Sequence, residues 1–190
     1  MSPTLPLGLT STVTLEDFLQ QANLEESPAW EYQDGAVIQK PMPKFRHSLL
    51  QQRLLRALED PQAQYLALPE LRCTFGGRSI VPDVVMIRCD RVMLNDRGEP
   101  EDQFNQAPDW AIEILSPDQS SNRVLDNLLH CLHQGSQLGW LVDPDDYSIV
   151  VLTPPHAIQI CRGEQILAVL PDLSLEITAQ TVFQWLKLGA

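Results

Sequence analysis

The segment from Pro108 to Pro144 constrains the fold of this chain more than any other part of the sequence. It begins with an apolar run of strand length, Trp110 to Leu115, and leucines then recur with helical spacing. Gly135 is placed to stop that helix, and a second apolar run follows from Gly139 to Asp143. Strand–helix–strand crossovers normally join parallel strands in a sheet that is covered by helices. The segment therefore predicts an α/β fold.

The remaining sequence adds further strands and helices to this unit. We predict a hairpin at 30–40 with its turn at Asp34-Gly35, a helix at 47–60, strands at 65–68, 71–75 and 80–87, antiparallel strands within 147–169, and a last helix from Thr178 or Thr181. Together these elements predict a single domain over 1–190, with a mixed β-sheet flanked by helices, an N-terminal hairpin and a β-rich C-terminal part. The hairpin and the strands of 147–169 either extend the central sheet or form a second one. Residues 1–13 are expected to form a loose arm.

Composition and charge narrow the class of protein. Hydrophobic residues make up 44% of the 190 residues, which favours a globular domain with a core over a disordered chain. The formal net charge of -12 argues against a protein that coats nucleic acid non-specifically, but leaves room for a local basic groove or for a metal between carboxylates and phosphate. No apolar run reaches the roughly 20 residues of a membrane helix, and no signal peptide is evident. We therefore expect a cytoplasmic protein with reduced cysteines.

Two carboxylates stand in strongly apolar surroundings. Glu113 lies inside the run from Trp110 to Leu115, and Asp83 follows Pro82 in a β-branched run, where a strand begins or bulges at the rim of a sheet. Two carboxylates that converge from neighbouring strands repel each other unless a cation lies between them. Oxygen ligands suit Mg²⁺ or Mn²⁺, and such a metal can activate water and stabilise the charge of a phosphodiester transition state.

Several motifs together, in their order and spacing, resemble a known family. They are Val81-Pro82-Asp83, Glu113 to Pro117, Gly139 to Pro144, Glu31-Tyr32 with Asp34-Gly35, Lys40 to Pro43 with His47, and Phe183 to Leu186. The chain resembles the "putative restriction endonuclease" family that is abundant in cyanobacteria, a domain of unknown function placed in the PD-(D/E)xK nuclease superfamily. The resemblance covers nearly the whole chain, from about Leu15 to Leu188.

The resemblance implies a function and a set of site residues. Asp83 matches the metal-binding aspartate, Glu113 matches the acidic residue of the (D/E)xK element, and the backbone carbonyl of Ile114 would be a further metal ligand. The implied activity is that of a Mg²⁺- or Mn²⁺-dependent endonuclease acting on DNA. A homodimer is expected because nucleases that cut duplex DNA often pair two sites across a two-fold axis.

The lysine of the (D/E)xK element is missing, because Leu115 stands at its position. Some members of the superfamily supply the lysine from the following helix, where the matching position here is Asn127. The nearest cation on that helix is Arg123, which shares its face with Asn127 at i, i+4 spacing. With His130, these two residues form a polar stripe opposite the leucines.

Two interpretations stay open for Arg123 and for His47. Arg123 can stabilise charge and bind phosphate, although it is a poor general base, or it can be a solvated charge on a helix. His47 either packs in the core or reaches the pocket at the sheet edge, and Lys44 is another candidate for the basic group. The alternative function is a catalytically impaired nuclease-fold protein that binds or scaffolds. In such a protein Glu113 has a fixed partner, such as Arg123 or a backbone N–H.

Overall fold

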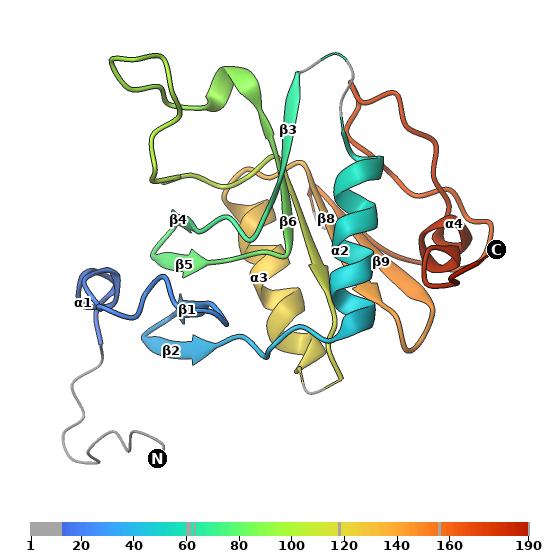
Figure 1. Ribbon diagram of the computed structural model, residues 1–190, viewed down its shortest axis with the longest axis horizontal. Helices are drawn as coiled ribbons and strands as arrows, with labels where there is room; N and C mark the ends of the chain where they lie inside the picture. Colours follow the sequence, from blue (N-terminus) through green and yellow to red (C-terminus); the bar gives the residue numbers. More distant parts are fainter. Residues whose placement is uncertain (1–12, 60–61, 63, 118, 156, 190) are drawn as a thin grey trace.

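The chain forms two β-sheets with helices packed against them (Figure 1). The computed structural model describes residues 13–59, 62, 64–117, 119–155 and 157–189, so the arm predicted at 1–13 lies outside the described residues except for Val13. The larger sheet has the strand order β10-β9-β8-β7-β6-β3, and the smaller sheet has the order β2-β1-β5-β4. The strands are β1 (Trp30–Gln33), β2 (Ala36–Gln39), β3 (Tyr65–Pro69), β4 (Cys73–Phe75), β5 (Arg78–Ile80), β6 (Val84–Arg88), β7 (Trp110–Ile114), β8 (Leu138–Asp143), β9 (Ser148–Thr153) and β10 (Ala157–Cys161). The helices are α1 (Leu15–Leu19), α2 (Phe45–Ala57), α3 (Ser121–His133) and α4 (Ala179–Gln184), with a 3-10 turn at Cys89–Arg91.

The larger sheet confirms the predicted strand–helix–strand unit. Strands β7 and β8 are parallel and are joined through α3, whereas the other pairs in this sheet are antiparallel. Strands β9 and β10 continue the same sheet, so the β-rich C-terminal part extends it. The expected strand within 165–169 is absent, and Ile166 forms an isolated bridge to Thr178 instead. Thr178 caps α4 by accepting a hydrogen bond from the backbone N–H of Thr181.

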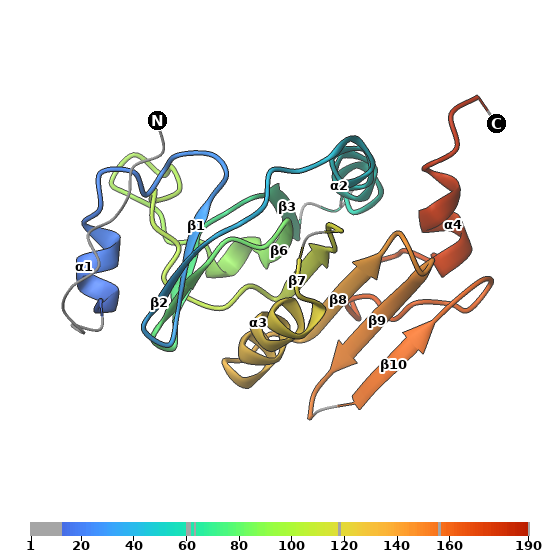
Figure 2. The ribbon, with the colours of Figure 1, turned by 90° about the horizontal axis from the view of Figure 1, so that it is seen from below.

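Helices cover both faces of the larger sheet (Figure 2). Helices α2 and α4 pack on one face together with Trp110, Ile112 and Ile114, and α3 packs on the other face together with Ala111. Side chains alternate along a strand, so Glu113 points to the face that carries α3. None of the described helices is both long and apolar enough to span a membrane.

The chain changes sheets at Pro82-Asp83. The strand predicted over 80–87 is therefore two strands: β5 belongs to the smaller sheet and β6 to the larger one. Pro82 has no N–H for a ladder bond, and the N–H of Val81 donates to the carboxylate of Glu31 at 2.8 Å. Asp83 lies just before β6 begins, as predicted for a residue at a sheet rim. Continuing the register of Val84 with Ile112 by one residue sets Asp83 opposite Glu113, with both side chains on one face.

The smaller sheet packs against the polar side of α3. Its hairpin turns at Asp34-Gly35, where both φ angles are positive (51° and 89°), as the tightest hairpin turns require. Arg78 in β5 pairs with Asp34 and, at 2.7 Å, with Asp126 in α3. His130 lies 3.2 Å from the carbonyl oxygen of Phe75 and stacks on its ring. The stripe predicted on α3 is thus a contact surface for the second sheet, and not a fully solvated face.

Candidate active site

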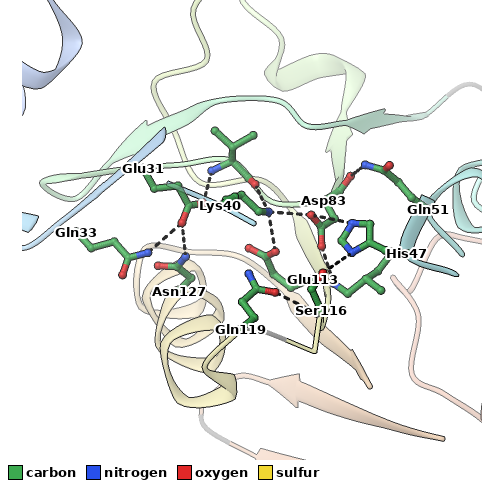
Figure 3. A network of polar contacts seen from close by, with 12 residues as sticks. Glu31, Gln33, Lys40, His47, Gln51, Asp83, Glu113, Ser116, Gln119 and Asn127 are labelled. Carbon is green, nitrogen blue, oxygen red and sulfur yellow. Dashed lines mark hydrogen bonds and ion pairs between the residues drawn. The ribbon is translucent and has the colours of Figure 1, made fainter. Parts of the chain in front are cut away.

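Lys40 lies between the two carboxylates that the sequence singled out (Figure 3). Its Nζ atom is 2.8 Å from Asp83 Oδ1, 3.1 Å from Glu113 Oε2 and 2.7 Å from the carbonyl oxygen of Val81. An ammonium group has three N–H donors, so these three acceptors use all of them. The side chain of Lys40 is only 12% exposed, and the contacts are therefore largely shielded from water.

The N-terminal hairpin delivers Lys40 to this position. Lys40 follows β2 directly, and its N–H donates to the carbonyl of Ala29 at 2.8 Å, which prolongs the hairpin by one residue. Pro41 and Pro43 have no N–H for a sheet ladder, so the strand ends there and the chain runs on into α2. The smaller sheet thus supplies the cation, whereas the larger sheet supplies the carboxylates.

Asp83 is held in place by hydrogen bonds on both sides. Its Oδ2 atom accepts the N–H of Ile114 at 2.7 Å, and its backbone carbonyl accepts the side-chain amide of Gln51 at 2.8 Å. Burial alone would raise the pKa of Asp83, but the charge of Lys40 and the hydrogen bonds from His47 and Lys40 outweigh burial and hold this pKa well below its usual range. Asp83 is therefore a carboxylate with a fixed orientation.

Glu113 behaves in the opposite way. Burial raises its pKa well above the usual value, and the carboxylates of Asp83 and Glu31 add to this rise, while Lys40 opposes it. Burial lowers the pKa of Lys40, but the nearby carboxylates outweigh that effect and raise it, so the ammonium keeps its proton at neutral pH. The two carboxyl groups that share one ammonium thus have pKa values shifted in opposite directions.

His47 reaches the site from the first turn of α2. Its Nε2 atom lies 3.4 Å from Asp83 Oδ1, and its Nδ1 atom lies 3.4 Å from the hydroxyl oxygen of Ser116. A neutral imidazole with its hydrogen on Nε2 would donate to Asp83 and accept from Ser116. Of the two interpretations for this histidine, the structure supports the one that places it at the pocket.

A third buried carboxylate, Glu31, lies beside the pair. Its Oε1 atom accepts the N–H of Val81, and its Oε2 atom accepts from Gln33 at 3.1 Å and from Asn127 at 3.4 Å. Asn127, which matches the helical lysine position of some relatives, is buried and donates to Glu31. Its own Oδ1 atom has no hydrogen-bond partner among the described residues. Asn127 thus helps to satisfy a carboxylate but brings no charge to the site.

Arg123 does not contact either carboxylate of the pair. It is exposed and, together with Lys40 and Glu113, lines a hollow of about 30 Å³. Within the described part of the chain its side chain forms no hydrogen bond or ion pair. Glu113 pairs with Lys40 instead, so the prediction that Arg123 could be the partner of this carboxylate is wrong.

The donor atoms of the site suit a hard divalent cation. Mg²⁺ is usually bound through one or two carboxylates and keeps further positions for water and phosphate oxygens. Asp83 and Glu113 supply two carboxylates, although no cluster of three or more His, Cys, Asp or Glu side chains suited to a metal occurs among the described residues. The N–H of Ile114 faces Asp83, and in a strand the C=O of a residue points to the same side as its N–H. The predicted ligands Asp83, Glu113 and Ile114 therefore fit Mg²⁺ or Mn²⁺ in chemical type.

Comparison with known proteins identifies the family of this chain. The family model of Uma2, described as "Putative restriction endonuclease", matches residues 15–181. The chain belongs to the Uma2 family. A crystal structure at 1.96 Å resolution, described as "a putative nuclease belonging to DUF820 from Anabaena variabilis ATCC 29413", has 40% sequence identity and a TM-score of 0.88, and the match covers 92% of this chain and 99% of that chain. No curated protein sequence matches. These findings confirm the family and the nuclease-like α/β fold that the motifs indicated.

In this Uma2 chain, Lys40 is the site residue whose role the sequence did not reveal. Lys40 is part of the family layout, but the residues that could replace the missing lysine were predicted to be Arg123 on α3, Lys44 or His47. One signal was present: the chain has three lysines, Lys40, Lys44 and Lys187, and Lys40 alone ends a predicted strand. Because side chains at strand ends gather at sheet rims, that position made Lys40 a candidate for the site.

Proposed function

We propose that this protein is a metal-dependent endonuclease that hydrolyses DNA phosphodiester bonds with Mg²⁺ or Mn²⁺. One observation carries the proposal: two buried carboxylates, Asp83 and Glu113, converge from neighbouring strands on the ammonium of Lys40. Membership of Uma2 and the likeness to a described nuclease support it. Lys40 takes the role of the lysine that Leu115 replaces in the strand.

The site residues divide the work of binding and orientation. Asp83, Glu113 and the carbonyl of Ile114 would hold the metal, which when bound supplies Lewis-acid activation of water and stabilises charge on phosphate. A hollow of about 20 Å³ lined by Lys40, Asp83 and other residues has room for about one water molecule. The Lys40 ammonium can turn an N–H from Asp83 toward such a water or toward a phosphoryl oxygen. Because it stays protonated, it acts by orientation and charge, not as a base.

The basic residues near the hollow would position the substrate. Arg123 is exposed and lines a hollow with Lys40, where its guanidinium can donate two parallel hydrogen bonds to a phosphate. His47 orients Asp83 through Nε2 and is itself oriented by Ser116. We therefore assign the catalytic roles in phosphodiester hydrolysis to Asp83, Glu113 and Lys40. Arg123 and His47 have positioning roles.

A second candidate function is a binding or scaffold protein without cleavage activity. The observation that favours it is the saturation of Lys40, whose three donors are all used within the protein. In this alternative the ammonium is a permanent structural partner of the two carboxylates, and no metal displaces it.

Cleavage of supercoiled plasmid DNA tests the proposal. The wild type is expected to nick plasmid with Mg²⁺ or Mn²⁺ and to leave it intact in EDTA. Asp83→Ala, Glu113→Gln and Lys40→Met should each lower the rate at least about 100-fold, the usual cost of removing a group that stabilises developing charge. Lys187→Met is the matched control, because that exposed lysine lies near the end of the chain. Cleavage that survives in Asp83→Ala would reject the assignment.

The assembly and location follow from the same proposal. We propose a homodimer, since nucleases that act on DNA often pair two sites across a two-fold axis, and a cytoplasmic location where DNA is accessible. Sedimentation of the purified protein at micromolar concentration tests the dimer, and a purely monomeric species would contradict it.

A further inference from the structure

A second hollow adjoins the carboxylate site at the start of α2. Its volume is about 260 Å³, and His47 and Ser116 line both this hollow and the small one at Lys40. Leu115, Pro117 and Pro144 supply much of its apolar wall. The space at Lys40 holds about one water, so a planar organic group that enters with a phosphate must be placed elsewhere. This neighbouring hollow is large enough to receive it.

Phe45 forms part of the hollow and has no role in the core. It is the first residue of α2 and is 74% exposed, whereas the other four phenylalanines, all within the described residues, are buried or half-buried. The helix packs on the sheet through Leu50 and Leu54, one and two turns further on. The fold therefore does not need an aromatic ring at position 45, and the ring is presented to solvent beside the site.

Basic side chains lie at the rim of this hollow. Lys44 and Arg46 flank Phe45 in the lining, and among the described lining residues Asp145 is the one carboxylate. Arg46 is held by Asp145 at 2.8 Å and by the carbonyl of Pro144, so its position is fixed. The ammonium of Lys44 and the guanidinium of Arg46 thus lie on either side of the Phe45 ring in the lining of the hollow, where each can donate hydrogen bonds to a phosphate oxygen.

An aromatic ring, an apolar wall and a basic rim together match a nucleotide. We propose that this hollow binds the base of a nucleotide next to the scissile phosphate, with Phe45 as the stacking surface and Lys44 and Arg46 facing the backbone. Proteins that bind single strands combine the same two features, a basic groove and aromatic rings on which bases stack. The inference rests on the proposed function, and it specifies the substrate: DNA whose bases are free to leave the stack, that is, single-stranded or locally opened DNA.

The binding of a labelled oligonucleotide tests this inference. The probe is a single-stranded DNA that contains 2-aminopurine, whose emission falls when the base stacks, with Ca²⁺ in place of Mg²⁺. Phe45→Ala should raise the Kd roughly 5- to 100-fold, the range for one base stacked on an aromatic ring, and should abolish the fall in emission. Phe45→Trp should keep both properties, while Phe45→Leu, which retains an apolar side chain without a ring, should behave like Phe45→Ala. Because residue 45 is exposed, all three variants should melt close to the wild type.

The outcomes separate this inference from the proposed function. If Phe45→Ala binds the oligonucleotide as the wild type does, or if duplex and single strand bind equally without any change in emission, the base-binding hollow is rejected, even where plasmid is still cleaved. If the wild type binds the probe through Phe45 but no metal supports cleavage, hydrolysis is rejected and the base-binding hollow stands.

Discussion

A single buried carboxylate, Glu31, lies beside a pair of buried carboxylates, Asp83 and Glu113, and their hydrogen-bond partners differ in kind. Glu31 accepts hydrogen bonds from a backbone N–H and from two side-chain amides, all of them neutral. Asp83 and Glu113 instead share the ammonium of Lys40. Both arrangements satisfy the rule that buried polar groups need hydrogen-bond partners. Their chemistry nevertheless differs, because the donors to Glu31 are neutral and the donor shared by Asp83 and Glu113 is a cation.

The difference separates a structural carboxylate from a candidate binding site. The donors to Glu31 are the backbone N–H of Val81, just after β5, and the side-chain amides of Gln33 in β1 and Asn127 in α3, so Glu31 joins the smaller sheet to that helix. Lys40 carries its charge at the end of a flexible four-carbon side chain, which can move aside when another cation arrives. Glu31 should therefore respond to mutation as part of the fold, and the Lys40 site should respond as a place where one cation replaces another.

The largest effect is expected for Lys40→Met. Removing one partner of a buried ion pair costs about 3–5 kcal/mol, and each kcal/mol lowers the Tm of a chain of this size by roughly 2–4 °C. Mn²⁺ should restore much of this loss and raise the Tm of the variant more than that of the wild type, because no ammonium competes for the carboxylates. Circular dichroism melts in EDTA and in Mn²⁺ measure both effects, with Lys187→Met as the control. Equal Tm shifts with Mn²⁺ in the variant and the wild type would mean that the Lys40 ammonium does not compete with a metal for the carboxylates.

The next effect is a pH dependence at Glu113. Its pKa is raised in the folded state, so its contribution to stability is full below the ordinary value of 4.5 and is lost as the pH rises toward the folded-state pKa. A glutamine amide cannot ionise, so the advantage of Glu113→Gln over the wild type should grow by up to about 1.4 kcal/mol per pH unit in this window. Denaturant unfolding in EDTA between pH 4 and pH 9 measures it. A difference that stays constant with pH would mean that Glu113 is already ionised in the fold.

A smaller effect, of about 1–3 kcal/mol, is expected for Glu31→Gln. The NH₂ group of the new glutamine would face N–H groups that now donate to Glu31. Buried N–H donors would then lack an acceptor. The Tm shift caused by Mn²⁺ should be the same as in the wild type, because Glu31 is not a ligand. Glu164→Gln, at an exposed position, is the matched control. A weakened response to Mn²⁺ would instead make Glu31 part of the cation site.

The smallest effect on stability is expected for Arg123→Ala. Exposed residues without partners change the free energy of unfolding by no more than about 0.5 kcal/mol. DNA binding should weaken by a similar factor for all sequences, and the slope of log K against log salt should fall by about one, as for the loss of one phosphate contact. Fluorescence anisotropy over a salt series measures this slope. An unchanged slope would leave Arg123 as a solvated charge.

Local patterns were enough to predict the scaffold of the site. The periodicity of residues 110–143 predicted β7, α3 and β8 in order, and the local context predicted Glu113 inside a buried strand and Asp83 where a strand begins. Such predictions succeed because alternation and helical spacing report on burial within a few residues.

Two features could not be predicted because they depend on how distant segments meet. The charge of Lys40 reaches Glu113 only because the smaller sheet docks on the larger one, which no periodicity encodes. The same docking covers part of the polar side of α3, so Asn127 is buried, whereas the sequence assigned it only to a polar stripe. The apolar run over 80–87 likewise concealed the change of sheets at Pro82, since both strands are apolar.

Because the chain changes sheets at Asp83, the three site residues come from segments that are synthesised one after another. During synthesis the hairpin that carries Lys40 leaves the ribosome first, and Glu113 follows long after it. The residue that joins the two sheets, Asp83, is also the residue that meets both Lys40 and the N–H of Ile114. A chain that has grown past Lys40 but not to Asp83 therefore has the ammonium without either carboxylate, and one that has grown past Asp83 but not to Glu113 has one of the two. The complete site needs all three residues and the contact between the two sheets.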